Sequence, residues 1–312
     1  MKLANHGSGK FRFAVSKDGL IAYDKHTPMT IRFDVNESNE LIKKRVIKWD
    51  ELDHYCEVAH LEISNRCNMN CWYCYTGDKK AQELNTQEWK HIIDNLADSG
   101  IFQVSFGGGE PTMREDMLTL AEHVMDSGMN LGMTTNGLSL PDASADFKRS
   151  LKFYFKQINI SWHQNALVVE KALRVLRDFE IPAGINYAFS QSMKDDNETV
   201  KMLAKEYNAE LLYLVYKPIN MDFKEQVDPE VVMLVAKETA NERIKTAVDG
   251  PCAGKCLMKK KFIDVDSLGY VYPCSFIRKP LGNLLVDKFD KIWKERGPQD
   301  ECPYVKFKEI VK

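Results

Sequence analysis

Short apolar stretches alternate with longer amphipathic ones between residues 57 and 245. The short stretches are rich in β-branched and aromatic residues and predict six strands, at 58–63, 103–106, 131–135, 157–162, 183–189 and 211–216. Between them, the spacing of apolar residues predicts one helix that begins with Thr86 as its N-cap and others at 117–125, 168–179 and 199–207. Strands that alternate with crossover helices predict a parallel sheet, and therefore an α/β fold.

The two flanking regions have a different pattern. The first 56 residues contain short β-like runs divided by turn residues, at 11–15, 20–23 and 30–35. They predict a small antiparallel sheet, which either packs against the rest or offers an edge to an extended partner. Near the other end, a turn at 266–269 lies between two β-like runs and predicts a hairpin. We therefore expect three parts, at 1–56, 57–245 and 246–312.

Composition limits the classes of function. The chain has 312 residues, enough for one large domain with an appendage, and its 44% hydrophobic and 28% charged residues are typical of a soluble globular protein. A net charge of −2 gives no overall field that attracts nucleic acid or an anionic membrane, so we expect neither as a partner. No signal peptide or membrane span is visible, so the eight cysteines favour metal ligation in the reducing cytoplasm over disulfides.

Three closely spaced cysteines follow the first predicted central strand. Cys67, Cys71 and Cys74 have the spacing C-x3-C-x2-C. Three thiolates can hold three irons of a cubane iron–sulfur cluster and leave the fourth iron open for chemistry. A zinc site would need a fourth ligand nearby, and the nearest later histidine, His91, lies inside a predicted helix. The spacing therefore favours iron–sulfur and leaves zinc as the alternative.

A glycine run follows the second of these strands. Gly107, Gly108, Gly109 and Glu110 come directly after residues 103–106. Without a Cβ, glycines let the backbone approach a ligand closely and adopt positive φ. The alternative is a plain strand-to-helix turn in which Glu110 caps a helix. Because the carboxyl ends of parallel strands meet at one edge of a sheet, we expect this run near the cysteines.

The two motifs, in this order and separation, resemble the signature of the radical S-adenosylmethionine (SAM) enzymes. That resemblance implies a partial (β/α)6 TIM-like barrel and a 4Fe–4S cluster on Cys67, Cys71 and Cys74 whose open iron binds SAM. One-electron reduction, by a donor of the flavodoxin or ferredoxin type, then cleaves SAM to a 5′-deoxyadenosyl radical that abstracts hydrogen from the substrate.

The resemblance also implies a set of cofactor-binding residues: Tyr73, Gly108, Gly109, Glu110, Asn136, Ser161 and Asn186. Asn136 lies in a Thr-Asn-Gly run and is a candidate for the ribose hydroxyls. Ser161 ends the fourth strand, where the family often has Ser-x-Asp, but here the acid is replaced by His163. A histidine can move a proton near neutral pH, so His163 is a catalytic candidate. Alternatively, it is a hydrogen-bonded histidine at a strand end.

The C-terminal part carries a second cysteine set: Cys252, Cys256, Cys274 and Cys302. Its Gly-x4-Cys run, with a later Gly-Asn-Leu and Ile-Trp, resembles the SPASM domain or its shorter twitch form, a β-hairpin and helix that holds an auxiliary cluster. Four cysteines can close one 4Fe–4S cube, and a four-cysteine zinc site is the alternative. Whether one iron stays open is undecided. The remaining Cys56 is interpreted as a buried core thiol.

An auxiliary cluster can accept the electron that remains after hydrogen abstraction. We therefore predict an oxidative radical SAM enzyme that crosslinks or dehydrogenates a peptide or protein side chain. The alternative is dehydrogenation or rearrangement of a small metabolite, such as a sugar or a nucleotide-like compound. A zinc-binding module that contacts nucleic acid is a third possibility, supported by the lysines at 259–261 alone.

Overall fold

Parallel strands form the centre of the computed structural model. It describes residues 56–76, 82–218, 223–250, 261–297 and 304, together with the backbone of three N-terminal strands. Seven strands follow the chain in order, each parallel to its neighbour: β4 (Val58–Ser64), β5 (Gln103–Gly108), β6 (Asn130–Thr135), β7 (Gln157–Ser161), β8 (Ala183–Phe189), β9 (Glu210–Val215) and β10 (Thr246–Val248). The six predicted strands are confirmed. β10 was missed because three residues carry no readable periodicity.

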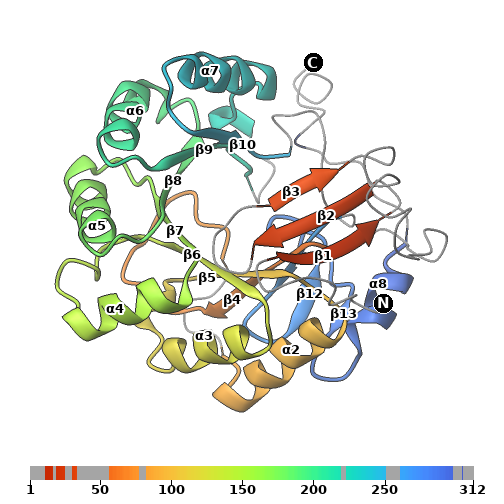
Figure 1. The fold of residues 1–312 in the computed structure, drawn as a ribbon. Helices are drawn as coiled ribbons and strands as arrows, with labels where there is room; N and C mark the ends of the chain where they lie inside the picture. Colours follow the sequence, from red (N-terminus) through yellow and green to blue (C-terminus); the bar gives the residue numbers. More distant parts are fainter. Residues whose placement is uncertain are drawn as a thin grey trace.

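Helices connect these strands and line the outer side of the curved sheet (Figure 1). They are α2 (Thr86–Asp98), α3 (Met117–Asp126), α4 (Ala145–Tyr154), α5 (Ala166–Asp178), α6 (Asn197–Glu206) and α7 (Pro229–Asn241). Short 3-10 turns precede some of them, at η1 (Pro111–Met113), η2 (Lys194–Asp196) and η3 (Phe223–Glu225). α4 and α7 were not predicted. In α4 a single residue, Leu151, is buried, so the apolar stripe that signals a helix is almost absent.

The start of α2 differs from the prediction by one residue. Asn85, not Thr86, is the N-cap: its Oδ1 accepts from the backbone N–H of Gln87 (2.9 Å) and of Glu88 (3.1 Å). Glu88 completes the capping box by accepting from the Asn85 backbone N–H at 2.7 Å. Thr86 instead donates its hydroxyl to Asp116 at 2.6 Å, which ties α2 to the start of α3.

The two faces of the large sheet differ in chemistry. On the face toward the helices, Ala59, Leu61 and Ile63 of β4 are fully buried, and the other strands continue this layer. On the inner face, β6, β7 and β9 present half-buried residues at alternate positions. Polar side chains such as Thr134 and Asn159 stand there. The inner face is therefore not packed as an apolar core, and it leaves polar groups facing the interior of the sheet.

The C-terminal part extends the same sheet. Strand β11 (Phe262–Val265) pairs parallel with β4, and β12 (Tyr270–Tyr272) and β13 (Gly282–Asn283) follow antiparallel. The predicted β11–β12 hairpin is confirmed: Asp266 accepts from the backbone N–H of Leu268 and Tyr270, and Gly269 has φ of 82°. A last helix, α8 (Phe289–Glu295), follows. Strand order runs from β10 to β13, with no pairing between these two edges among the described residues.

The N-terminal strands form a sheet of their own. Strands β1 (Phe11–Ser16), β2 (Gly19–Asp24) and β3 (Thr30–Phe33) pair antiparallel in the order β1-β2-β3. This confirms the predicted small sheet, drawn in red in Figure 1. The boundaries of the three predicted parts stay predictions, although β10 lies in the central sheet beyond residue 245. Within the described part of the chain, every helix is too short or too polar to cross a membrane.

Candidate active site

The cysteine loop begins where β4 ends. Cys67, Cys71 and Cys74 are all partly buried on this loop. Local hydrogen bonds shape the loop: the Met69 backbone N–H donates to Cys67 Sγ (3.4 Å), and the Cys74 N–H donates to the Cys71 carbonyl (3.2 Å). Cys74 Sγ also lies 2.9 Å from Thr76 Oγ1. Three reduced thiols on one short loop at the carboxyl end of a parallel strand are a donor set that suits an iron–sulfur cluster.

The glycine run holds this loop in place. The backbone N–H of Gly109 donates to the Ser64 carbonyl (2.6 Å), and that of Glu110 donates to the Arg66 carbonyl (2.7 Å). A Cβ on Gly108 would lie 2.5 Å from the Ser64 carbonyl oxygen, and Gly108 has φ of 105°. The sequence predicts that this run approaches a ligand closely. These two amides instead approach backbone carbonyls of the protein itself. What the glycines provide here is contact with the segment that leads into the cysteines.

Glu110 is the buried centre of this end of the sheet. Its side chain caps η1 by accepting from the Thr112 backbone N–H (3.1 Å), as the alternative reading expected. It also accepts from the hydroxyls of Thr112 and Thr135, both at 2.7 Å, and from the Asn136 backbone N–H at 2.7 Å. Four donors on a residue that is 1% exposed form a clamp between the ends of β5 and β6. A direct contact with the cofactor stays a prediction.

Asn136 connects β6 to the cysteine loop. Its side-chain amide donates to Asn68 Oδ1 at 2.7 Å and lies 4.0 Å from Cys67 Sγ, while its own Oδ1 accepts from the Leu138 N–H. Most of its hydrogen-bonding groups therefore have partners inside the protein. The expected contact with the ribose remains a prediction, as does the role of Ser161, which lies half-buried near the end of β7.

His163 contacts the cysteine loop directly. Its Nδ1 lies 3.5 Å from Cys71 Sγ and within hydrogen-bonding distance of the Tyr73 hydroxyl, and the two rings are stacked. Tyr73 also donates to the Trp162 carbonyl at 2.9 Å. Burial lowers the pKa of His163 to about 4 and raises that of Tyr73, so both side chains are neutral at pH 7. The contacts anchor the loop to β7, and the catalytic role of His163 stays a prediction.

Two buried polar atoms at the same end of the sheet have no partner among the described residues. They are His163 Nε2, two residues beyond the end of β7, and Asn186 Oδ1 on the neighbouring strand β8. The Asn186 amide nitrogen donates to Thr134 at 3.3 Å, so the side chain is oriented while its oxygen is left over. An unpaired buried group costs about 1–3 kcal/mol, a cost that a polar ligand removes. Together with the cysteine loop, these atoms fit a polar cofactor such as SAM beside an iron–sulfur cluster.

The second cysteine set is described only at Cys274. Its side chain is half-buried, just beyond β12. Cys252, Cys256 and Cys302 lie outside the described residues, so the auxiliary cluster remains a prediction. Cys56 is 2% exposed within the apolar core, and burial raises the pKa of its thiol, which confirms it as a core residue.

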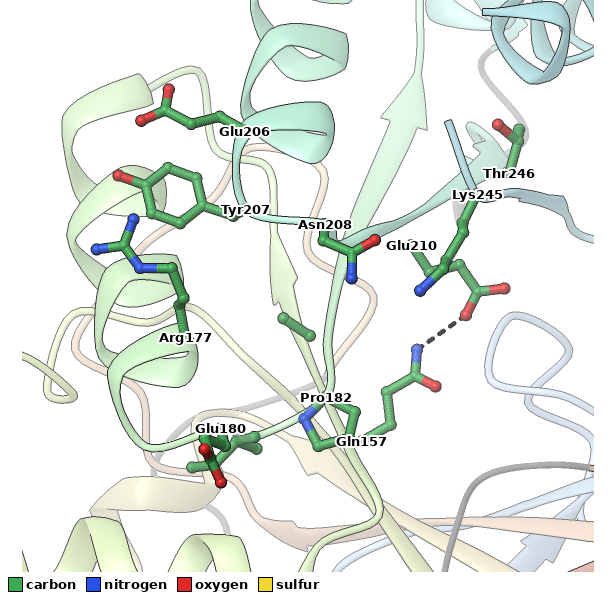
Figure 2. A pocket seen from close by; sticks show the side chains of 12 residues that line it. Gln157, Arg177, Glu180, Pro182, Glu206, Tyr207, Asn208, Glu210, Lys245 and Thr246 are labelled. Carbon is green, nitrogen blue, oxygen red and sulfur yellow. Dashed lines mark hydrogen bonds between the residues drawn. The ribbon is translucent and has the colours of Figure 1, made fainter. Parts of the chain in front are cut away.

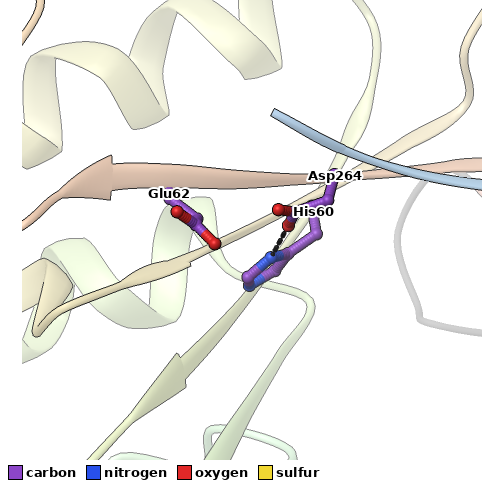
Figure 3. Close-up of side chains that lie close together, drawn as sticks. All are labelled: His60, Glu62 and Asp264. Atoms are coloured by element: carbon purple, nitrogen blue, oxygen red, sulfur yellow. Dashed lines mark hydrogen bonds and ion pairs between the residues drawn. The ribbon is translucent and has the colours of Figure 1, made fainter. Parts of the chain in front are cut away.

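The sequence does not predict two features of the structure. One is a cavity of about 740 Å³ at the amino ends of β7 to β10 (Figure 2), where the Gln157 amide donates to Glu210 at 2.9 Å. It lies at the opposite end of the strands from the cysteines. The other is a buried group of His60, Glu62 and Asp264 on β4 and β11 (Figure 3). Its signal was two polar residues at alternate positions of an otherwise apolar strand.

Comparison with known proteins gives consistent results. Residues 61–174 match the model of the radical SAM superfamily. The AdoMet-dependent heme synthase of Methanosarcina barkeri is 25% identical, over 80% of this chain and 88% of the relative. Mycofactocin maturase MftC of Mycobacterium ulcerans is 27% identical, over 75% of this chain and 73% of its own. Among solved structures, Streptococcus suis SuiB bound to precursor peptide SuiA has a TM-score of 0.72 at 13% identity, covering 96% of this chain and 89% of SuiB.

The matched segment contains the geometry described above. It runs from the middle of β4 through the cysteine loop, the glycine run and the strands that end just before Asn136 and His163. The likeness to SuiB shows the same fold over nearly the whole chain. The loops that this segment brings together are those that the family signature names, so residues 61–174 form a radical SAM superfamily domain.

Proposed function

We propose that this enzyme oxidatively modifies the side chains of a peptide, by a crosslink or a dehydrogenation. The observation that carries the proposal is the position of the cysteine loop. It lies at the carboxyl end of the sheet, where His163 Nε2 and Asn186 Oδ1 are buried without a partner among the described residues. When bound there, a 4Fe–4S cluster with SAM supplies a 5′-deoxyadenosyl radical through one-electron reductive cleavage of SAM. A donor of the flavodoxin or ferredoxin type would deliver that electron.

The residues of this chain have separate tasks in the proposal. Cys67, Cys71 and Cys74 would hold three irons, and the backbone contacts from Gly109 and Glu110 keep their loop at the end of β4. The unpaired atoms of His163 and Asn186 would bind polar groups of SAM. Neutral His163 suits this task, because it can accept or donate one hydrogen bond without bringing a charge near the thiolates.

A peptide substrate is supported by the relatives and by the shape of the fold. MftC is named a maturase, and the SuiB structure contains a precursor peptide. Here, β1 and β3 are the outer strands of the N-terminal sheet, and in the described part of the chain neither has a second neighbour. An extended peptide can add to such an edge through main-chain hydrogen bonds. The half-buried polar inner face of the large sheet leaves room for its side chains.

The acceptor of the second electron is proposed to be one auxiliary 4Fe–4S cluster on Cys252, Cys256, Cys274 and Cys302. Its support is the four-cysteine count together with the β11–β12 hairpin, which leads to Cys274. The hairpin joins β4, the strand that also leads into the cysteine loop. Cys274 therefore lies just beyond β12, a strand separated from β4 by β11 alone.

A small-metabolite substrate is the second candidate. The likeness to the AdoMet-dependent heme synthase, over most of both chains, favours it. That relative is named as the synthase of a small molecule, heme. Proteins similar to this chain are therefore not restricted to peptide substrates.

The test uses anaerobically reconstituted enzyme with SAM and dithionite. Synthetic peptides are made from each short reading frame that flanks the gene. Stimulated 5′-deoxyadenosine and the loss of two hydrogen atoms from one peptide, both measured by mass spectrometry, are expected. Cys71→Ala serves as the inactive control. If every peptide stays unchanged while a small metabolite stimulates 5′-deoxyadenosine, the peptide proposal is wrong.

A further inference from the structure

A buried ionic network lies on the inner face where β4 meets β11. The register places His60 of β4 opposite Asp264 of β11, and His60 Nδ1 lies 2.6 Å from Asp264 Oδ1 (Figure 3). Arg278, which follows β12, donates to Asp264 Oδ2 at 3.0 Å and also to Glu62. Ser275 adds a fourth donor to the network, at 3.1 Å from Asp264 Oδ1. Asp264 is fully buried, whereas the side chain of Arg278 is 27% exposed.

The charges in this network balance at neutral pH. Although burial opposes its charge, the hydrogen bond from His60 and the guanidinium of Arg278 hold the pKa of Asp264 below its usual range. Burial and the neighbouring charge of Asp264 raise the pKa of Glu62 to about 9. Ionised Asp264 therefore pairs with Arg278, while Glu62 keeps its proton.

The same groups are not arranged as a metal site. His60, Glu62 and Asp264 lie close enough to be considered as ligands. However, the ligand nitrogen of His60 is bonded to the carboxylate rather than aimed with it at a common point. Arg278 already supplies a positive charge to both carboxyl groups. A cation would have to displace the guanidinium and break the histidine–carboxylate bond.

The second nitrogen of His60 is left available. Among the described residues, no hydrogen bond is made to Nε2, and the side chain is 12% exposed. The ring lies across β5 at Gly107: a Cβ there would be 2.8 Å from His60 Cε1 and closer still to Nε2. Only glycine leaves space for this ring position. Gly107 thus lets the imidazole lie on the inner face, with one nitrogen fixed by Asp264 and the other unpaired.

We propose that His60, oriented by Asp264, accepts the proton that the substrate loses during its oxidation. A carboxylate on Nδ1 fixes the tautomer in which Nε2 carries the lone pair, as in other carboxylate–histidine pairs that act as general bases. The surroundings of His60 are Glu62 on β4, Tyr75 from the cysteine loop and Arg278. This inference deepens the proposed function and rests on it.

The oxidation balances in atoms and electrons. The 5′-deoxyadenosyl radical takes a hydrogen atom from a substrate C–H bond and becomes 5′-deoxyadenosine. The substrate radical then gives one electron to an oxidised iron–sulfur cluster. A second substrate X–H bond breaks as the new bond forms, and its proton goes to His60 Nε2. Two electrons and two hydrogens leave the substrate, and His60 returns its proton to water.

The first test needs no substrate. Reconstituted protein labelled with ¹⁵N-histidine is examined by NMR at neutral pH, and the His60 signals are assigned by their loss in His60→Asn. A neutral ring protonated at Nδ1, with Nε2 unprotonated, is the expected result. A ring protonated at Nε2, or at both nitrogens, overturns the proposal.

The second test uses a peptide that the parent enzyme modifies. His60→Asn should keep its iron content and still form 5′-deoxyadenosine, while product per 5′-deoxyadenosine falls by about 100-fold, the usual share of a general base. Added imidazole should restore part of the product in His60→Gly. Unchanged product per 5′-deoxyadenosine in His60→Asn would overturn the proposal. If no peptide is modified by the parent although the tautomer is as expected, the proposed function has failed rather than the inference.

Two glycine variants distinguish an effect of the His60 ring position from a general loss of structure. Gly107→Ala pushes its Cβ into the His60 ring, whereas a Cβ at Gly132 of β6 meets its nearest atoms at 3.7 Å, an ordinary contact. The Gly107 variant should shift the His60 NMR signals and lower product per 5′-deoxyadenosine, and Gly132→Ala should do neither. Equal behaviour of the two variants contradicts the assigned position of the ring.

Discussion

The two ends of the large sheet are both lined with polar groups, but they differ in how these groups are paired. At the carboxyl ends, Glu110 clamps two strands, and His163 and Asn186 still keep one unpaired buried atom each. At the amino ends, beside the 740 Å³ cavity, the amide of Gln157 is shared by Glu210 and Asn159. An open cavity is therefore a weaker marker of a site than oriented polar atoms that lack a protein partner.

The largest contrast should come from the thiols. Changing Cys67, Cys71 and Cys74 together to alanine should lower iron from about eight to about four per reconstituted chain and abolish SAM cleavage, because three ligands of one cube are gone. Iron and acid-labile sulfide assays measure this. Parent protein with about four irons, and almost none in the variant, would leave the C-terminal cysteines as a zinc or structural site. Unchanged iron in the variant would contradict the proposed cluster site.

Gly109→Ala should destabilise the carboxyl end. The new Cβ would lie 2.7 Å from the Asn65 carbonyl oxygen and closer to that of Arg66, and backbone cannot move aside as a side chain can. We expect a loss of about 3 kcal/mol in the free energy of unfolding, at the upper end for overpacking. Urea titration followed by circular dichroism measures it, with Gly132→Ala as the tolerated control. Equal stability of both variants would contradict the close approach.

The same substitution at the two ends gives a matched pair. Glu110→Gln places an NH₂ group among four donors and should cost about 2 kcal/mol, since one buried donor loses its acceptor. Glu210→Gln, at the amino end, should cost much less and leave SAM cleavage unchanged. Thermal unfolding and 5′-deoxyadenosine formation measure the two effects. A larger loss in the Glu210 variant would reverse the comparison between the ends.

The most gradual effect should appear in the pH dependence of stability. Since burial raises the pKa of Glu62 to about 9, the folded state keeps a proton that the unfolded state releases above its ordinary pKa. Glu62 therefore lowers stability as pH rises from about 5 to about 9, by at most about 1.4 kcal/mol per pH unit. Subtracting the curve of Glu62→Gln from that of the parent, in urea titrations, isolates this slope. A difference that rises with pH would mean that Glu62 is ionised in the folded protein.

The sequence was most informative where periodicity is long. All six central strands and four helices were found, because buried strands and amphipathic helices repeat their pattern over several turns or pleats. Prediction was weakest at local detail. The sequence predicts Thr86 as the N-cap, but Asn85 forms the cap. Both residue types can cap a helix, and only the backbone conformation decides between them. The short strand β10 and the polar helix α4 gave no clear period.

Site residues were found where they belong to a spaced motif. The thiols and the glycine run were located, but their mutual contacts were not. The backbone bonds from Gly109 and Glu110 to the segment before the cysteines join residues more than 40 positions apart in sequence. Likewise, the stacking of Tyr73 on His163 depends on how β7 lies beside the loop. His60 and Asp264 were missed as a pair because 204 positions separate them.

By itself, then, the sequence determined the radical SAM match of residues 61–174, the parallel α/β order and the position of the cysteine loop, since these depend on local spacing and composition. Only the tertiary structure decided which polar groups pair and which are left over. Pairing depends on register between strands: β11 beside β4 brings Asp264 to His60, and β7 beside β8 leaves His163 Nε2 and Asn186 Oδ1 without a partner among the described residues. Register is a property of the whole sheet, because each strand is fixed by the burial of its apolar face against the helices.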